Sequence, residues 1–412
     1  MVNFEKHILS NGLKVLVHRD DATPMAAVNV LYDVGARDEH PDRTGFAHLF
    51  EHFMFEGSVN IPSYDRPLQF AGGENNAFTT NDITNYYLSI PAQNLEVAFW
   101  LESDRMLSLA FSEDKLGTQK NVVTEEYRQS YLNQPYGDAW LLLQPLAYKV
   151  HPYRWSTIGA SIEHIQHANL KDVRGFFDRF YHPGNAILTV TGHVEPDHVF
   201  KLAEKWFGSI PRGNGCMREL PQEPLQREER RLTVYRDVPQ SQVYMAFHIC
   251  GRTHADFHTA DLISDLLAGG ESARLNSKLV LDHKIFSEVN AYVTGHLDPG
   301  LLIVTGKPHP EIDIHKAEDA LWTEVSLLVN EAVGERELQK VKNKVEASHV
   351  FSESNMLAKA MNLAYYELMG DAGLLNRQVE AWFNVSAEDI QRVAGEVFSR
   401  RNASVLHYLV KT

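Results

Sequence analysis

Short apolar runs, separated by turn-forming residues, mark the first part of the chain. Residues 4–17 predict two short strands around the Asn11-Gly12 turn, and the apolar, β-branched run 26–32 is typical of a central strand. Residues 78–90, rich in Thr, Asn and Tyr, predict a further strand. Amphipathic periodicity predicts helices between and after these strands, over residues 63–71, 95–109 and 113–133. This pattern indicates a fold of the α/β class in its α+β form.

A helix followed by a closing strand occurs twice along the chain. In the first copy Asp172 precedes Asn185, and in the second Asp389 precedes Asn402 at the same spacing. Chance similarity between two helix–strand pairs is the alternative, but the equal spacing favours an internal duplication of about 200 residues. We therefore predict two homologous domains, each a mainly antiparallel sheet covered by helices.

The predicted boundary lies in residues 211–229, which combine Pro, Gly and charged residues and show no apolar periodicity. This composition is typical of a linker. We predict a first domain over residues 1–215, a linker over 216–230 and a second domain over 231–412.

One predicted helix carries the pattern His48-x-x-Glu51-His52. Residues four apart lie on one helix face, so the two imidazoles can bind a single Zn²⁺ ion. The order is the inverse of the commoner His-Glu-x-x-His signature of metalloproteases. Glu51 lies close enough to act as the general base that takes a proton from a zinc-bound water. We predict one Zn²⁺ per chain.

A catalytic zinc requires a third protein ligand and an open position. Glu126 is the best candidate, and its neighbour Glu125 is the rival. Because adjacent helical residues differ by about 100° in direction, only one of the two can face the metal.

The histidine pair could also have a purely structural role instead of binding a metal. Two histidines at this spacing are more often surface or core residues than ligands. However, Glu51 lies on a helix rich in Phe and Leu, where an unpaired carboxylate is costly to bury, and a nearby cation removes that cost. A second pair, His254 and His258, has no carboxylate between its members, so we predict that it binds no metal.

Composition limits the classes of partner. The formal net charge of −15 argues against nucleic acid and anionic membranes as partners. The two cysteines, Cys216 and Cys250, form no Cys-x-x-Cys motif and no disulfide framework. No apolar run is long enough to span a bilayer, and the first ten residues do not resemble a signal peptide. We expect a cytoplasmic protein, or a periplasmic one if a leader has been removed.

Several blocks of the chain resemble the inverted-motif zinc peptidases, the family of pitrilysin, insulin-degrading enzyme and mitochondrial processing peptidase. The similarity covers most of the chain and is densest in residues 1–200. The matching blocks, in order, are residues 11–15, 35–39, 48–52, 72–77, 84–87, 122–126 and 134–137. The resemblance implies a zinc-dependent endopeptidase that hydrolyses peptides or unfolded segments inside a chamber, with this chain forming half of a clam-shaped enzyme.

The resemblance also implies roles for individual residues. Glu126, rather than Glu125, takes the place of the family's third ligand. The family tends to have a supporting Glu seven residues before this ligand, where this chain has Gln119. Asn76, Ala77 and Phe78 match a strand edge to which a peptide substrate adds main-chain hydrogen bonds.

In the family, an Arg and a Tyr from the other half of the chamber help to stabilise the tetrahedral intermediate. An alignment with a one-residue gap places Leu281 and Ser287 at those positions here. We therefore expect a heterodimer with a homologous subunit that supplies the Arg/Tyr pair, with a homodimer as the second choice. The alternatives are a non-catalytic scaffold subunit of a peptidase-like complex and a metal-binding protein without hydrolysis.

Overall fold

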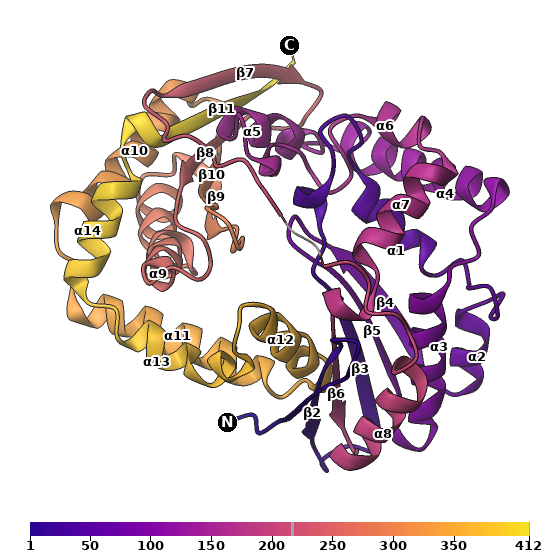
Figure 1. Ribbon diagram of the computed structural model, residues 1–412. Coiled ribbons are helices and arrows are strands. Elements are labelled where there is room, and N and C mark those ends of the chain that lie inside the picture. Colours follow the sequence, from indigo (N-terminus) through magenta and orange to yellow (C-terminus); the bar gives the residue numbers. More distant parts are fainter. Residues whose placement is uncertain (216–217, 412) are drawn as a thin grey trace. The chain divides into compact units, whose positions relative to one another are not determined.

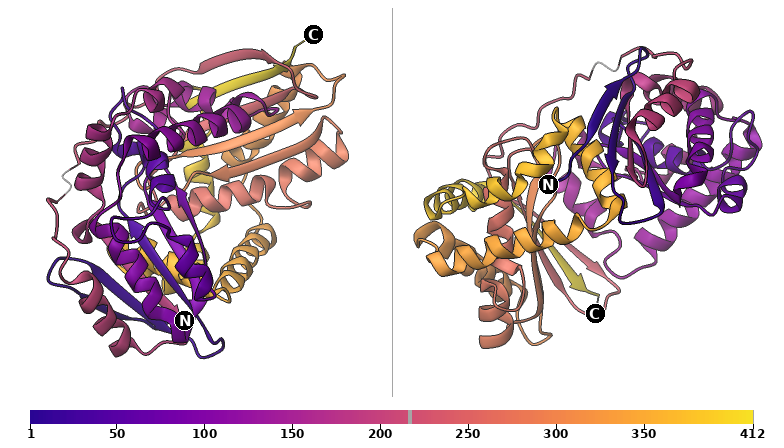
Figure 2. Two further views of the ribbon diagram at one scale, coloured as in Figure 1. Left: turned by 90° about the vertical axis from the view of Figure 1, so that its right-hand side faces the viewer. Right: turned by 90° about the horizontal axis from the view of Figure 1, so that it is seen from below.

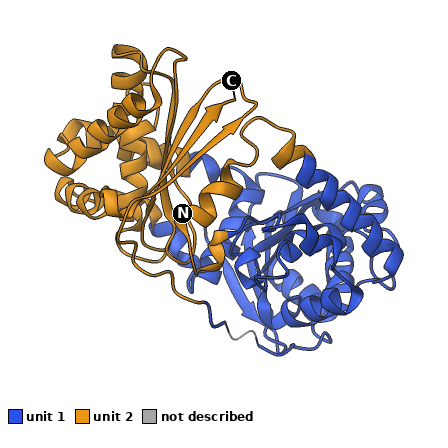
Figure 3. Ribbon diagram, turned by 90° about the horizontal axis from the view of Figure 1, so that it is seen from above, with its two compact units in different colours: residues 1–128, 155–220, 350–377 blue, residues 129–154, 221–349, 378–412 orange. Residues whose placement is uncertain are grey.

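The structure is a computed structural model that describes residues 1–215 and 218–411. The chain divides into two compact units, each with its own sheet (Figures 1 and 3). Both sheets are mainly antiparallel and covered by helices, which confirms the predicted fold class. The units consist of residues 1–128, 155–220 and 350–377 (unit 1) and residues 129–154, 221–349 and 378–412 (unit 2).

Unit 1 contains a six-stranded sheet in the order β1-β2-β6-β3-β5-β4. The pair β2–β6 is parallel and the other neighbours are antiparallel. The predicted hairpin around Asn11 and the predicted central strand are both confirmed. The strands are β1 (Glu5–Ile8), β2 (Lys14–Arg19), β3 (Met25–Tyr32), β4 (Glu74–Thr79), β5 (Thr84–Pro91) and β6 (Ala186–Gly192).

Helices cover both faces of this sheet, so β3 is buried along nearly its whole length. Figures 1 and 2 show α12 lying along one face. There Leu363 packs into a cluster with Leu16, Leu31 and Ile187 of the sheet. The helices of unit 1 are α1 (Phe46–Phe53), α2 (Asp65–Phe70), α3 (Leu95–Leu107), α4 (Glu113–Tyr127), α6 (Ile162–Gln166), α7 (Leu170–Phe180), α8 (Pro196–Phe207) and α12 (Met356–Leu368).

The prediction of a single strand over residues 78–90 is wrong. This part of the chain forms the hairpin β4–β5, in which Thr79 pairs with Thr84. The backbone N–H of Thr80 donates to the carbonyl of Ile83 and closes the turn. Asn81 and Asp82 supply the turn, as residues with short polar side chains commonly do.

Unit 2 contains a five-stranded sheet in the order β7-β11-β8-β10-β9. Alternate residues of β8 face opposite ways: Phe247 packs with the helices on one face, and Tyr244 with α5 on the other. The strands are β7 (Arg230–Arg236), β8 (Gln242–His248), β9 (Phe286–Val293), β10 (Leu301–Pro308) and β11 (Ala403–Val410). The helices are α5 (Ala139–Ala147), α9 (Phe257–Ala268), α10 (Ile314–Asn330), α11 (Glu335–Ser352), α13 (Gln378–Phe383) and α14 (Ala387–Val397).

Each unit contains a helix from the other half of the sequence. Helix α5 packs on the sheet of unit 2, and α12 packs on the sheet of unit 1. The prediction of two continuous domains does not include this exchange, because apolar faces such as that of Leu143 do not specify which sheet they cover. The predicted linker 216–230 begins with two residues, 216 and 217, that lie outside the described residues.

The two units share local details that support the predicted duplication. The side chain of Asn185 donates to the carbonyls of Asp33 and Phe180. Asn402 donates in the same way to the carbonyls of His248 and Val397. Helices α7 and α14 both have 11 residues and begin with a side-chain cap. The same polar interactions therefore join helix and sheet in both units.

Candidate active site

Helix α1 presents His48, Glu51 and His52 on the side that its apolar residues leave free. Phe46, Leu49, Phe50 and Phe53 are buried. The helix starts after Gly45, which has φ +87°. A Cβ atom there would lie 2.8 Å from the carbonyl oxygen of Ile158, so glycine allows both this conformation and the close approach.

Buried polar groups hold both ends of α1. At the start, the Glu39 carboxylate accepts hydrogen bonds of 2.8 Å from the backbone N–H groups of Gly45 and Ala47. At the end, the hydroxyl of Tyr86 donates to the carbonyl of Phe50 at 3.2 Å, and the Arg105 guanidinium lies 3.5 Å from that of Met54. These side chains bind backbone groups that the ends of a helix leave without partners inside the helix.

Arg105 is the largest fully buried side chain of this region, with 2% of its surface exposed. It donates to the buried carboxylate of Glu102 at 2.6 Å and stacks on the rings of Tyr64 and Tyr86, at 4.4 and 4.5 Å from their centres. An ion pair in such surroundings depends on both partners, because either charge alone would be costly to bury.

Three predicted ligands converge beside α1. Glu126 of α4 places its two carboxylate oxygens 3.6 Å from Nε2 of His48 and 3.4 Å from Nε2 of His52. The two imidazole rings are nearly perpendicular, with centres 4.9 Å apart. Ligand atoms of all three residues lie within 4.8 Å of one another.

This geometry fits a tetrahedral metal centre. With zinc–ligand bonds of about 2.0–2.1 Å, neighbouring ligand atoms in a tetrahedron lie about 3.3 Å apart. The 3.4 and 3.6 Å contacts, one to each carboxylate oxygen of Glu126, are close to this spacing. Burial lowers the pKa of His48, although Glu126 opposes the shift, and the interaction with His52 lowers the pKa of Glu126. Both shifts favour the neutral imidazole and the ionised carboxylate that metal binding requires.

Glu51 points toward strand β4. Its carboxylate accepts a 2.7 Å hydrogen bond from the hydroxyl of Thr79, the last residue of that strand. Thr79 is not among the site residues predicted from the sequence. The missed hairpin concealed it, because a continuous strand over 78–90 gives position 79 no special place.

The structure places Glu125 away from the histidines. Its side chain is 54% exposed, and its carboxylate lies 3.6 Å from the guanidinium of Arg128 one turn later. Gln119, on the same face of α4 as Glu126, is 7% exposed and donates its amide N–H to Glu56. The amide oxygen of Gln119 and Nδ1 of His48 are both buried and have no partner among the described residues.

The three predicted substrate-binding residues, Asn76, Ala77 and Phe78, lie on β4. This strand is at the end of the sheet and, among the described strands, pairs with β5 alone. The Asn76 side-chain oxygen accepts a 2.8 Å hydrogen bond from the N–H of Ala77. A peptide that added to this edge would replace that local hydrogen bond.

A second group, His315, Glu318 and His407, also has closely spaced ligand atoms. Here the carboxylate is already satisfied. Arg231 donates to both oxygens of Glu318 at 2.5 and 2.8 Å, and His407 lies 2.8 Å from one of them. We interpret this group as an ion-pair network, because a metal would have to displace these donors.

The remaining predictions concern residues without metal-binding geometry. Nε2 of His258 interacts with Gln378 at 3.0 Å, and neither His254 nor His258 belongs to a metal-binding group of the described residues. Leu281 and Ser287 offer no guanidinium or phenol.

None of the helices described is both long and apolar enough to cross a membrane.

Two family models match the chain. Insulinase (Peptidase family M16) matches residues 14–149, and the Peptidase M16 inactive domain matches residues 167–345. The "Zinc protease PqqE" of Helicobacter pylori is 30% identical over 96% of this chain and 90% of its own length.

Solved structures of proteases also match the chain. The crystal structure of a protease from Helicobacter pylori matches over the whole of both chains, with a TM-score of 0.93 and 29% identity. The periplasmic protease PqqL from Escherichia coli shares the fold at 16% identity and a TM-score of 0.82, over 99% of this chain and 48% of that chain. The predicted resemblance is confirmed: the chain belongs to the insulinase family of peptidases, family M16.

Proposed function

We propose that the chain is a zinc-dependent endopeptidase of peptides or unfolded segments, with one zinc ion held by His48, His52 and Glu126. The observation that carries this proposal is the convergence of these three side chains at the ligand spacing of a tetrahedral zinc site. Bound zinc would polarise the scissile carbonyl and make water more acidic.

Glu51 is the proposed general base. Its hydrogen bond with Thr79 fixes one carboxylate oxygen against the end of β4, which leaves the other to accept a proton from water. The carboxylate can then donate that proton to the leaving amine. The buried Phe side chains of α1 limit the access of water to one side of the helix.

The edge of β4 is the proposed binding surface for substrate. A peptide strand that pairs with Asn76, Ala77 and Phe78 would receive main-chain hydrogen bonds on the strand that also positions Glu51. The same strand would then hold both the substrate and the base Glu51 in fixed positions, which favours productive alignment of the two.

A partner subunit is the proposed source of further stabilisation for the tetrahedral intermediate. Leu281 and Ser287, at the positions of the family's Arg and Tyr, cannot supply charge or a phenolic hydroxyl. A longer family member such as PqqL has about twice the length of this chain. We therefore propose a heterodimer first and a homodimer second; light scattering that finds a fully active monomer would contradict both.

The test is metal-dependent hydrolysis of a quenched fluorescent peptide library. Hydrolysis should stop when a chelator removes the zinc and return on addition of one zinc ion per chain. The assay should use both the chain alone and the chain isolated from its host with any subunit that co-purifies. Stoichiometric zinc with no hydrolysis in either form would contradict a peptidase and favour a metal-binding scaffold subunit.

A further inference from the structure

The sheets of the two units differ at one end. In unit 1, β2 lies between β6 and β1, and β1 pairs antiparallel with β2 over residues 5–8. In unit 2, β7 is the last strand of the sheet and, among the described strands, pairs with β11 alone. Figure 1 shows β7 along the outer edge of this sheet. One long side of β7 is therefore open.

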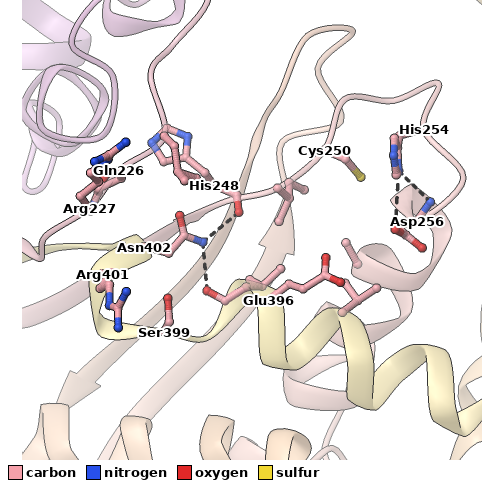
Figure 4. A pocket seen from close by; sticks show the side chains of 15 residues that line it. Gln226, Arg227, His248, Cys250, His254, Asp256, Glu396, Ser399, Arg401 and Asn402 are labelled. Carbon is pink, nitrogen blue, oxygen red and sulfur yellow. Dashed lines mark hydrogen bonds and ion pairs between the residues drawn. The ribbon is translucent and has the colours of Figure 1, made fainter.

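The internal duplication makes β7 the counterpart of β2. Asn185 precedes β6 and donates to the carbonyl of Asp33, and Asn402 precedes β11 and donates to the carbonyl of His248 (Figure 4). Strand β2 runs parallel to β6, and β7 runs parallel to β11 in the same way. The strand that covers β2 therefore has no counterpart among the strands described in unit 2.

The segment before β7 is unsuited to fill this place. Pro221 and Pro224 lack the N–H group that a strand donates to its neighbour. The side chain of Gln226 donates to the carbonyl of Ala403 at 2.8 Å, which holds the segment beside the first residue of β11. The open side of β7 is thus a consequence of the sequence that precedes it.

The main chain of β7 has hydrogen-bonding groups on this open side. The N–H of Lys411 donates to the carbonyl of Arg236 at 2.8 Å, so that carbonyl points toward β11. Because successive carbonyls of a strand point to alternate sides, those of Arg231, Thr233 and Tyr235 point the other way. The carbonyl of Tyr235 accepts a 3.1 Å hydrogen bond from the side chain of Arg236, a local contact that a neighbouring strand would replace.

A second copy of β7 fits this side in the antiparallel direction. When two copies pair about Thr233, Leu232 of each copy lies opposite Val234 of the other, and Arg231 lies opposite Tyr235. The first pair is apolar, and the second brings a guanidinium to a ring that is 59% exposed. In this register the residues whose main-chain groups face the open side also lie opposite one another.

Charged side chains on an edge strand commonly prevent such pairing, but the arginines of β7 are already bound within their own unit. Each has a carboxylate partner; the pairs are Arg230–Glu223, Arg231–Glu318 and Arg236–Asp138. The only like charges that the register places opposite each other, Arg230 and Arg236, therefore meet with their charges balanced. Strand β7 also pairs with β11 in an unbroken register over residues 230–236, so no bulge bends its open side away.

We propose that β7 joins two copies of this chain across a two-fold axis through Thr233, so that their unit 2 sheets continue into each other. The contact is isologous, because each copy offers the groups that it also receives. A single strand makes a small interface, so the dimer depends on concentration. The proposal goes beyond the peptidase and does not depend on it. It concerns a second copy of this chain and not the Arg/Tyr-bearing subunit proposed above.

Light scattering on the full chain alone, over a series of micromolar concentrations, tests the dimer. The mass should rise from one chain toward two. Thr233→Pro removes the N–H that each copy donates across the axis, at an exposed edge position that tolerates proline, so the dissociation constant should rise at least tenfold. Thr233→Ser keeps the N–H and is the matched control. A parent that stays monomeric, or a proline variant that dimerises as the parent does, would overturn the proposal.

Oxidative cross-linking tests the register and decides if the proline variant fails to fold by circular dichroism. In a background of Cys216→Ser with Cys250→Ser, Thr233→Cys places two thiols directly opposite, with Cα atoms about 5.5 Å apart, within disulfide range. Tyr235→Cys places them about 14 Å apart, too far for a disulfide. Diamide should link the first variant and not the second. Failure to link Thr233→Cys, or equal linking of both, would contradict the proposal. Neither measurement needs zinc or substrate, so each is independent of the proposed activity.

Discussion

The hydroxyl of Thr79 donates a 2.7 Å hydrogen bond to the carboxylate of Glu51. This contact joins the last residue of the edge strand β4 to helix α1, which carries two of the proposed metal ligands. The proposed base and the proposed substrate-binding strand therefore have a fixed relative position, which neither element could provide by itself.

Replacing Thr79 tests the value of this contact. Thr79→Val keeps the shape but removes the donor, so we expect kcat to fall by about 10- to 100-fold with little change in KM. Thr79→Ser keeps the hydroxyl and should retain most of the parent kcat. Steady-state kinetics on both variants, with zinc content measured, gives the answer. A valine variant with the parent kcat would show that Thr79 does not position the base.

The assignment of the third ligand predicts a difference between adjacent residues. Glu126→Ala should weaken zinc binding by more than about 100-fold, beyond the 10- to 100-fold that loss of an outer-shell group costs. Glu125→Ala, whose carboxylate lies beside Arg128 at the surface, should bind zinc within about threefold of the parent. Competition with a fluorescent chelator measures both. Equal losses would contradict the assignment of Glu126 alone.

The candidate metal site could be predicted from the sequence more fully than the fold around it. His48, Glu51 and His52 share one helix, so their spacing alone brings them together. Thr79 meets Glu51 only through the β4–β5 hairpin, and local pattern does not distinguish one long polar strand from two short ones. The exchange of α5 and α12 between the two units could not be predicted either, because an apolar helix face does not specify which sheet it packs against.

The buried ion pair beneath α1 predicts a large stability effect. Arg105→Met leaves the Glu102 carboxylate buried without its cation, so we expect the free energy of unfolding to fall by about 3–5 kcal/mol. The double variant with Glu102→Met should recover part of this loss. Chemical unfolding by urea measures both. A loss below 1 kcal/mol for Arg105→Met would contradict the buried-pair interpretation.

Glu318 predicts a pH dependence of stability. Burial alone would raise its pKa, but hydrogen bonds from His407 and Arg231 outweigh burial and lower it well below the ordinary value. Because the pKa in the folded state is depressed, this stabilisation is present above about pH 4.3, the ordinary pKa of Glu, and is lost as pH falls toward the folded-state pKa.

Glu318→Gln should therefore lower the free energy of unfolding by about 2–4 kcal/mol at pH 7. We expect the lower part of this range, because Arg231 is itself 41% exposed. The difference from the parent should shrink as the pH is lowered from 5 to 3 in urea unfolding experiments. The exposed Glu311→Gln is the control. A difference that stays constant with pH would contradict the predicted shift.

Hydrolysis by Glu51→Gln tests most directly whether Glu51 acts as the base of a zinc peptidase. The variant and the parent should be compared as isolated from the host, with any co-purifying subunit and with equal zinc content. We expect the variant to keep one zinc per chain and to hydrolyse the quenched peptide at least about 100-fold more slowly. Hydrolysis by the variant at the parent rate would contradict the account.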